Sequence, residues 1–222
     1  IWMKWRGWQA MTKYEAIFRR KSVRKYTNEK VEEGILQEIR EFGKDAVGVR
    51  PDIRIKWKIY QASDHKVRGL FQVKAPYYAA LYSEDSEDYH MNAGCLMQQL
   101  VLHLHTIGIG TCYQGGARLK EDAEEGLELM MILAFGYPAE PLERSRSDFK
   151  RMELKKLIKA NVPVGRIQKK LLEPARLAPS ALNQQPWRFV VTENRIHLFV
   201  RRPGPVGYQK QLNKNLFNAG IA

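Results

Sequence analysis

Hydrophobic and polar residues alternate along the first third of the chain in a way that predicts two helices and two strands. Thr12 can cap a short helix, with Glu15 at the capping-box position. A second helix is predicted from Val31 to Phe42, because the apolar residues Ile35, Leu36 and Ile39 share one face. RIKWKIYQA (54–62) alternates apolar and basic residues, which predicts a half-buried strand, and APYYAALYS (75–83) predicts a more fully buried one.

The middle of the chain carries its longest apolar stretch, MNAGCLMQQLVLHLHTIGIGT (91–111). A helix this apolar must be buried on most sides, so we expect it to be the central helix. His103 and His105 do not share a helix face, which favours packed or surface histidines over metal ligation. A further helix is predicted around Glu121 to Leu129, followed by the strand MMILAFGYP (130–138).

The last third repeats the order helix, loop, strand, helix. GRIQKKLLEPARL (165–177) predicts a helix, WRFVV (187–191) a strand, and YQKQLNKNLFNAG (208–220) a helix whose FNAG resembles the earlier MNAG. This weak internal repeat predicts two related halves, residues 12–143 and 144–222, that form one globular unit, with the second half possibly truncated. A chance similarity between helix–strand–helix units is the alternative.

The composition is that of a globular protein, with 222 residues, 44% hydrophobic and 27% charged. A net charge of +13 favours anionic partners, which include nucleic acid, an anionic membrane surface, and a phosphorylated cofactor or substrate. The charge alone does not choose among them.

The cysteines, the length of the apolar runs and the N-terminal segment bear on metal binding and on location in the cell. Cys95 and Cys112 lack metal-ligand spacing, so we expect two reduced thiols and no metal site. No apolar run reaches the roughly 20 residues that span a bilayer, and no signal-peptide core is visible, which predicts a cytoplasmic protein. The opening IWMKWRGWQA belongs to a segment, residues 1–11, that is either an artificial leader or an arm that seeks a membrane or partner.

Two loops carry the candidate chemistry. FRRKSVRKY (18–26) surrounds the Ser22 hydroxyl with five cations, and arginine forks fit phosphate, although such a run can also be a solvated surface or a nucleic-acid patch. APSALNQQPW (178–187) offers backbone N–H groups, a hydroxyl and amides, which suit a planar heterocycle better than a nucleic-acid backbone. A plain turn followed by a core tryptophan is the alternative.

These segments together resemble the FMN-dependent nitroreductase family. The resemblance rests on RRKSVRKY, GIGTCYQGG (108–116), ILAFGYP (132–138) and ARLAPSALNQQPWRFVV (175–191), and it extends from Thr12 onward. It is strongest to the branch in which two degenerate halves are fused in one chain. The family implies an α+β fold with a mostly antiparallel sheet, here arranged as a pseudo-twofold pair of halves.

The resemblance also implies which residues contact the cofactor. Ordinary members build each flavin site from the Arg-rich loop of one subunit and the APSxxNxQPW loop of the other. The implied contacts to FMN phosphate, ribityl chain and pyrimidine edge are Arg20, Lys21, Ser22 and Arg24, and those from across the interface are Pro179, Ser180, Ala181 and Asn183. Gln114, Gly115 and Gly116 match the turn that approaches the ring. A second phosphate-binding pair is either Lys150 and Arg151 or Arg144 and Arg146.

The implied activity is the reduction of nitroaromatic, quinone or related small-molecule acceptors by NAD(P)H through ping-pong hydride transfer, with no catalytic side chain because FMN carries the chemistry. The chain departs from the family where GKDAVGVRP (43–51) stands in place of a first APS loop. We therefore expect a single flavin site per chain, in a monomer with pseudo-dimeric halves or in a homodimer. A flavin-binding protein without turnover and a basic nucleic-acid-binding protein are the alternatives.

Overall fold

The computed structural model describes residues 11–64, 67–69, 72–119 and 124–222, so nearly all of the predicted leader lies outside the described residues. The capping box at the start of the first helix is confirmed. The backbone N–H of Glu15 donates to Thr12 Oγ1 (3.2 Å), and the Thr12 N–H donates to Glu15 Oε2 (2.8 Å). This reciprocal pair satisfies two N–H groups that a helix start leaves without a partner.

The main sheet has four antiparallel strands in the order β1-β3-β6-β4. Its inner strand β3 is buried along its whole length, as its apolar sequence predicted. Residues Tyr77, Ala79 and Leu81 face the main core, and the alternate residues Tyr78 and Ala80 face a second cluster beneath the small ribbon β2-β5. The strands are β1 (Ile55–Gln61), β2 (Val67–Gly69), β3 (Tyr77–Ser83), β4 (Gly110–Tyr113), β5 (Ala117–Leu119) and β6 (Glu128–Gly136).

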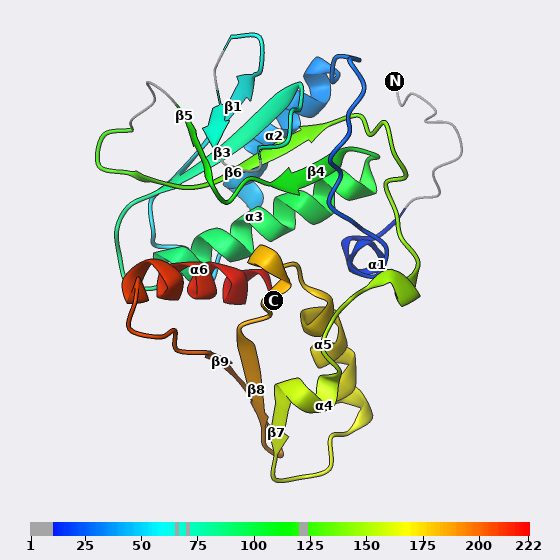
Figure 1. Cartoon of the computed structure of the whole chain (residues 1–222), viewed down its shortest axis with the longest axis vertical. Helices are drawn as coiled ribbons and strands as arrows, with labels where there is room; N and C mark the ends of the chain where they lie inside the picture. The colour runs from blue at the N-terminus through cyan, green and yellow to red at the C-terminus, as the bar shows by residue number, and fades with distance from the viewer. Residues whose placement is uncertain (1–10, 65–66, 70–71, 120–123) are drawn as a thin grey trace.

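Helix α3 runs through the centre of the molecule between this sheet and the C-terminal helix α6 (Figure 1). Eleven of its eighteen residues are buried, which confirms the prediction of a central helix. Leu96, Leu100 and Leu104 belong to the main core, where α2 also contributes Leu36 and Ile39. The helices are α1 (Lys13–Ile17), α2 (Glu33–Asp45), α3 (Tyr89–Thr106), α4 (Leu154–Leu157), α5 (Arg166–Leu177) and α6 (Tyr208–Ile221).

The MNAG and FNAG segments meet where α3 crosses α6. A Cβ at Gly94 would overlap the carbonyl oxygen of Phe217 and lie 3.2 Å from the Cα of Gly220. A Cβ at Gly220 would overlap the carbonyl oxygen of Met91 and lie 2.9 Å from the backbone nitrogen of Cys95. Only glycine at both positions lets the two backbones approach this closely.

A smaller layer carries α4, α5 and a three-stranded sheet at one end of the molecule (Figure 1). In this sheet β7 pairs with β8 in parallel, and β8 pairs with β9 antiparallel. Trp187 opens β8 and is fully buried in the main core, so it anchors the layer to the rest of the fold. The elements are β7 (Ile158–Ala160), β8 (Trp187–Val191), β9 (Ile196–Val200) and the 3-10 turns η1 (Arg146–Asp148) and η2 (Ala181–Asn183).

The helix predicted around Glu121 to Leu129 is wrong in its described part, from Glu124 onward; residues 121–123 lie outside the described residues. Glu124 and Leu127 form an isolated bridge around a turn in which Gly126 has φ +70°. Strand β6 then begins at Glu128, which pairs with Ser83 of β3. Pairing with a buried strand therefore overrides the local helix propensity of this acidic segment.

Candidate functional site

Arg20, which follows α1, is a buried cation that is only 3% exposed. A backbone bridge to Glu143 holds its segment in place, and the Arg144 N–H donates to the Arg19 carbonyl (2.9 Å). The Arg20 guanidinium donates to Ser22 Oγ at 3.3 Å, while its buried Nε has no hydrogen-bond partner. A buried donor without a partner is costly, and such a donor often marks the place of a ligand or water.

Arg144 and Arg151 lie near Arg20, and the three charges repel one another. Burial, and then the charge of Arg20, lowers the pKa of Arg144 to about 10 and that of Arg151 also to about 10. Burial is likewise the largest cause that lowers the pKa of Arg20. Arg144 also lies over the ring of Phe149, with its guanidinium 3.6 Å from the ring centroid. Within the described residues, none of the three forms an ion pair with a carboxylate, and only the charge of Asp148 partly offsets that of Arg144, so this arginine cluster carries an excess of positive charge.

Arg151 also holds the APSALNQQPW loop. Its Nε donates to the carbonyl of Ala178 (2.9 Å), and its terminal nitrogen donates to Asn183 Oδ1 (2.5 Å). Asn183 Nδ2 in turn donates to the Lys150 carbonyl (2.7 Å). One arginine therefore joins the arginine cluster to the loop predicted to border the ring.

The same loop has an uncommon backbone conformation. Leu182, Asn183 and Gln185 all have positive φ, between 48° and 56°, a region that residues with a Cβ seldom adopt. Its hydrogen bonds hold it there: the Gln185 N–H donates to Ser180 Oγ (2.9 Å), and the Ala181 N–H donates to Asn218 Oδ1 (3.2 Å). Buried Gln185 accepts the N–H of Met152 at 2.7 Å. Such strain is often found at ligand-binding sites.

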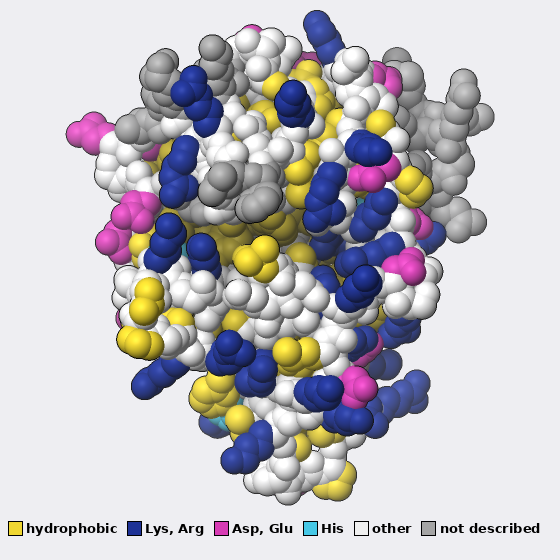
Figure 2. Space-filling model, in the orientation of Figure 1, with side chains coloured by type: hydrophobic (Ala, Val, Ile, Leu, Met, Phe, Trp, Pro, Cys, Tyr) yellow, Lys and Arg dark blue, Asp and Glu magenta, His cyan; other side chains and the backbone are white. Residues whose placement is uncertain are grey.

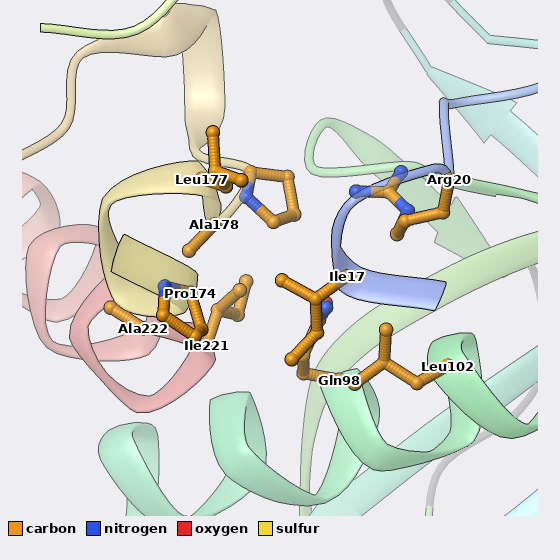
Figure 3. Close-up of a pocket in the computed structure, with 10 residues that line it drawn as sticks. Ile17, Arg20, Gln98, Leu102, Pro174, Leu177, Ala178, Ile221 and Ala222 are labelled. Carbon is orange, nitrogen blue, oxygen red and sulfur yellow. The ribbon is translucent and has the colours of Figure 1, made fainter. Parts of the chain in front are cut away.

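Arg20 and Pro179, from the two predicted loops, line one cavity of about 60 Å³ (Figure 3). Figure 3 shows the Arg20 guanidinium directed toward the end of α5 and the loop that follows it. The rest of the lining is mainly apolar, from α1, α3, α5 and α6: Ile17, Leu102, Pro174, Leu177 and Ile221. This volume is well below the roughly 300–1,000 Å³ of typical small-molecule sites, so the cavity cannot hold a flavin ring.

A wider hollow is visible between the main sheet and the layer of α6 and η2 (Figure 2). Apolar side chains form its floor, and Lys and Arg side chains lie along its rim. The predicted glycine turn follows β4. Gln114 is buried and committed to the fold, because its Oε1 accepts the Val73 N–H (2.8 Å) and its Nε2 donates to the Cys112 carbonyl (3.1 Å). Gly115 and Gly116 are exposed, and a Cβ at Gly115 would meet no atom within 4 Å.

The remaining predicted residues are not all free for a ligand. Lys21 Nζ lies 3.7 Å from a Glu140 carboxylate oxygen, so its charge is partly compensated. Arg24 is exposed and donates to the Ser22 carbonyl at 3.4 Å. Each of the two alternative basic pairs has one member in the arginine cluster, Arg144 or Arg151. Of the other members, Lys150 is exposed and only its carbonyl bonds the loop, through Asn183, and Arg146 lies 3.5 Å from a Glu173 oxygen.

Sequence reasoning did not identify Asn218 and Gln185 as residues that position the loop. The repeated NAG motif was a usable signal for Asn218, because Asn92 of the first motif makes an equivalent bond. Asn92 Oδ1 accepts the Arg50 N–H (3.0 Å) from the GKDAVGVRP segment. Gln185 carried no such signal, since its partner lies in another segment.

A family model described as "Putative TM nitroreductase" matches residues 12–214. The chain belongs to this nitroreductase family. A crystal structure of a "putative nitroreductase" from Thermotoga maritima is 26% identical, with a TM-score of 0.65, and the alignment covers 95% of this chain and 83% of that one. The α+β nitroreductase fold is thereby confirmed.

Two further relatives match a smaller part of the chain. A crystal structure of a "putative nitroreductase in complex with fmn" from Desulfovibrio desulfuricans has 18% identity and a TM-score of 0.51, over 67% of this chain and 96% of that one. A Staphylococcus haemolyticus protein named "Putative NAD(P)H nitroreductase" is 51% identical over 43 residues, which are 19% of this chain and 20% of that protein. The aligned segment is thus about a fifth of that curated relative.

Two kinds of feature are absent from the described residues. No helix among them is long and apolar enough to cross a membrane. In the same ranges, no group of three or more His, Cys, Asp or Glu side chains is placed to hold a metal ion.

Proposed function

We propose that the chain binds FMN and acts as an NAD(P)H-dependent oxidoreductase of nitroreductase type. The observation that carries this proposal is the arginine cluster of Arg20, Arg144 and Arg151. Three partly or fully buried guanidiniums with lowered pKa values, and with no carboxylate partner among the described residues, favour an anionic ligand. A phosphate monoester supplies two negative charges and several acceptor oxygens for such donors.

The residues present fit this cofactor in two respects. The unpartnered Nε of buried Arg20 and the hydroxyl of Ser22 would face the phosphate end. A Cβ at Gly115 would meet no atom within 4 Å, and the hollow with an apolar floor offers a surface that suits a planar ring. The cavity beside Arg20 has room only for the small end of the cofactor, so the ring would occupy the outer hollow.

The remaining roles follow from charge and geometry. When bound, FMN supplies the hydride transfer between NAD(P)H and a nitroaromatic, quinone or related acceptor. Arg24 is the better candidate to stabilise negative charge at the pyrimidine edge, because Lys21 is already close to Glu140. Ser180, Ala181 and Asn183 would border the ring through a loop that Arg151 and Asn218 hold in place. The names of the Desulfovibrio and Staphylococcus proteins support FMN and the nicotinamide reductant.

We also propose that the chain consists of two related halves, residues 12–143 and 144–222, which build a single flavin site. Equivalent contacts support this proposal. Gly94 and Gly220 each approach the carbonyl oxygen three residues before the other glycine. Asn92 and Asn218 each accept an N–H from the loop that follows α2 or α5.

The test measures FMN binding and reduction in the wild type, in Arg20→Gln, and in the control Arg40→Gln on the exposed surface of α2. We expect Arg20→Gln to raise the Kd for FMN by about 10- to 100-fold, because it removes a charged donor from the phosphate. Arg40→Gln should leave this Kd unchanged. Circular dichroism would establish that both variants fold.

Stopped-flow mixing of the FMN-loaded protein with NADPH and with NADH then separates the functions. Bleaching of the flavin absorbance that recovers on addition of a quinone supports the oxidoreductase. FMN binding without bleaching by either nucleotide indicates a flavin-binding protein without turnover. If the wild type fails to bind FMN at micromolar concentration, the proposal is wrong.

A further inference from the structure

A second and larger concavity lies between α1 and α5, on a part of the surface that the proposed flavin site does not use. Its volume is about 700 Å³, in the range of small-molecule sites. Tyr14 and Phe18 line it from the α1 side, Arg146 and Leu154 from η1 and α4, and Arg166, Lys169, Lys170 and Glu173 from α5. We call this concavity the α1–α5 groove.

The α1–α5 groove carries an excess of positive charge. Arg166, Lys169 and Lys170 form no ion pair with any carboxylate in the part of the chain that the structure describes. Glu173 is the one acidic residue in the lining, and the Arg176 guanidinium occupies both of its oxygens at 2.6 and 2.8 Å. Figure 2 shows the resulting accumulation of Lys and Arg side chains over α5. Such a surface attracts anions.

The opposite wall of the α1–α5 groove offers aromatic surface. Tyr14 is 53% exposed, although tyrosine usually buries much of its ring. It meets Phe18 edge to face, with ring centroids 5.2 Å apart. The Arg146 guanidinium lies 5.0 Å from the Phe18 centroid. The exposed ring of Tyr14, supported by the half-buried ring of Phe18, is a surface on which a heterocyclic base can stack.

Helix α5 adds to the positive potential at the end where Arg166 lies. Its N-cap residue, Gly165, provides no side-chain cap, so the first N–H groups of a 12-residue helix are left without that partner. These groups carry the positive end of the helix dipole. The unpaired side chains of Arg166, Lys169 and Lys170 lie within the first two turns of the same helix.

From this combination we propose that the α1–α5 groove binds a phosphorylated nucleotide, with the phosphates on Arg166, Lys169 and Lys170 and the base against Tyr14 and Phe18. A free nucleotide fits better than a nucleic-acid strand, because the aromatic wall and the unpaired cations share one concavity of limited size. This inference does not depend on the proposed flavin site, because Arg20, Arg144 and Arg151 do not line the groove. Arg146 lines the groove and also belongs to one of the two basic pairs predicted for the flavin phosphate. Its guanidinium contacts Glu173 and the ring of Phe18.

The test titrates ADP, adenosine and inorganic phosphate into the full chain by calorimetry, both as purified and saturated with FMN. We compare the wild type with Lys169→Glu/Lys170→Glu and with the charge-matched control Lys30→Glu/Lys44→Glu, whose residues do not line the groove. The first double variant should raise the Kd for ADP by about tenfold or more, because two charged donors are lost. The control should change it less than about threefold, since exposed charges away from the ligand are screened.

A third variant tests the aromatic wall. Tyr14→Ala should weaken ADP binding severalfold and leave the weaker binding of inorganic phosphate unchanged, because phosphate makes no stacking contact. Arg20→Gln, which should lose FMN, should keep its affinity for ADP, so failure of one proposal is distinguishable from failure of the other. Equal ADP affinity in the wild type and Lys169→Glu/Lys170→Glu, no ADP binding at millimolar concentration, or tighter binding of a single-stranded oligonucleotide than of ADP would each overturn the inference.

Discussion

The close crossing of α3 and α6 can be tested by substituting glycines with alanine. The substitution should destabilise the protein at Gly94 and Gly220, where the two helices cross, and stabilise it at Gly34 in α2. A Cβ at Gly220 would overlap the Met91 carbonyl oxygen and lie 2.8 Å from its carbon, and a Cβ at Gly94 would lie 3.0 Å from the carbonyl carbon of Phe217. Neither obstacle is the end of a flexible side chain, so the two helices themselves must separate. At Gly34 in the first turn of α2, by contrast, a Cβ meets no atom within 4 Å.

The magnitudes follow from two opposing effects. Alanine favours a helix over glycine by up to about 1 kcal/mol, and this gain is present at all three positions. Overpacking of a rigid contact costs about 1–3 kcal/mol, and more where backbone must move. We therefore expect Gly220→Ala and Gly94→Ala to lower the free energy of unfolding by about 1–2 kcal/mol, and Gly34→Ala to raise it by up to about 1 kcal/mol.

Thermal unfolding followed by circular dichroism measures these changes, at about 2–4 °C in Tm for each kcal/mol in a protein of this size. Gly34→Ala is the control for helix propensity. If Gly220→Ala and Gly94→Ala raised the Tm as Gly34→Ala does, the helices would not be in backbone contact and the reasoning would be refuted. Chemical denaturation at constant m-value would show that the change lies in the native state.

Two further predictions concern a buried histidine and the loop asparagines. Burial, and then the charges of Arg20 and Arg19, lowers the pKa of His105 from 6.5 to about 4, so the unfolded chain binds the extra proton between these values. The contribution of His105 to the free energy of unfolding is therefore fully present above pH 6.5 and falls by up to about 3 kcal/mol as the pH drops toward 4. In urea unfolding, His105→Gln should flatten this dependence of stability on pH. An unchanged slope, or equal flattening by the control His197→Gln at an exposed site, would show that His105 is not its cause. Asn218→Ala and Asn92→Ala should each cost about 1–3 kcal/mol, because each leaves a backbone N–H without its acceptor, but only Asn218→Ala should weaken FMN binding in a fluorescence titration. Equal FMN affinity in the two variants would argue against a role of Asn218 in the flavin site.

The sequence predicted those parts of the fold that depend on residues close together in the chain. The capping box of Thr12 and Glu15 needs only four consecutive residues, and the short, tyrosine-rich apolar run of 75–83 favours a buried strand. The prediction of a helix around Glu121 to Leu129 was wrong because the acidic residues of this segment favour a helix locally. The pairing of Glu128 with Ser83 depends instead on a strand that is distant in the sequence. A turn at Gly126 was the available signal.

The candidate site shows the same limit at a finer scale. The motifs predicted two loops as candidates, and Arg20 and Pro179 from these loops line one cavity. They did not show that one member of each alternative basic pair, Arg144 and Arg151, lies near Arg20, because that depends on how the segment after β6 folds back. The α1–α5 groove was equally invisible, since its two walls come from helices far apart in the sequence.

The arginine cluster connects the energetics of the fold to the proposed function. With pKa values of about 10, Arg144 and Arg151 remain charged at neutral pH, so the folded chain bears their repulsion with Arg20 rather than releasing protons. An anion that binds there removes this repulsion and satisfies the Nε of Arg20, and any ligand that binds only the folded state stabilises it in proportion to RT ln(1 + [L]/Kd). Because Arg151 also holds Ala178 and Asn183, the same anion would fix the guanidinium that keeps the strained loop in position. Under the proposed function, phosphate binding and the shape of the ring site would therefore be coupled through a single side chain.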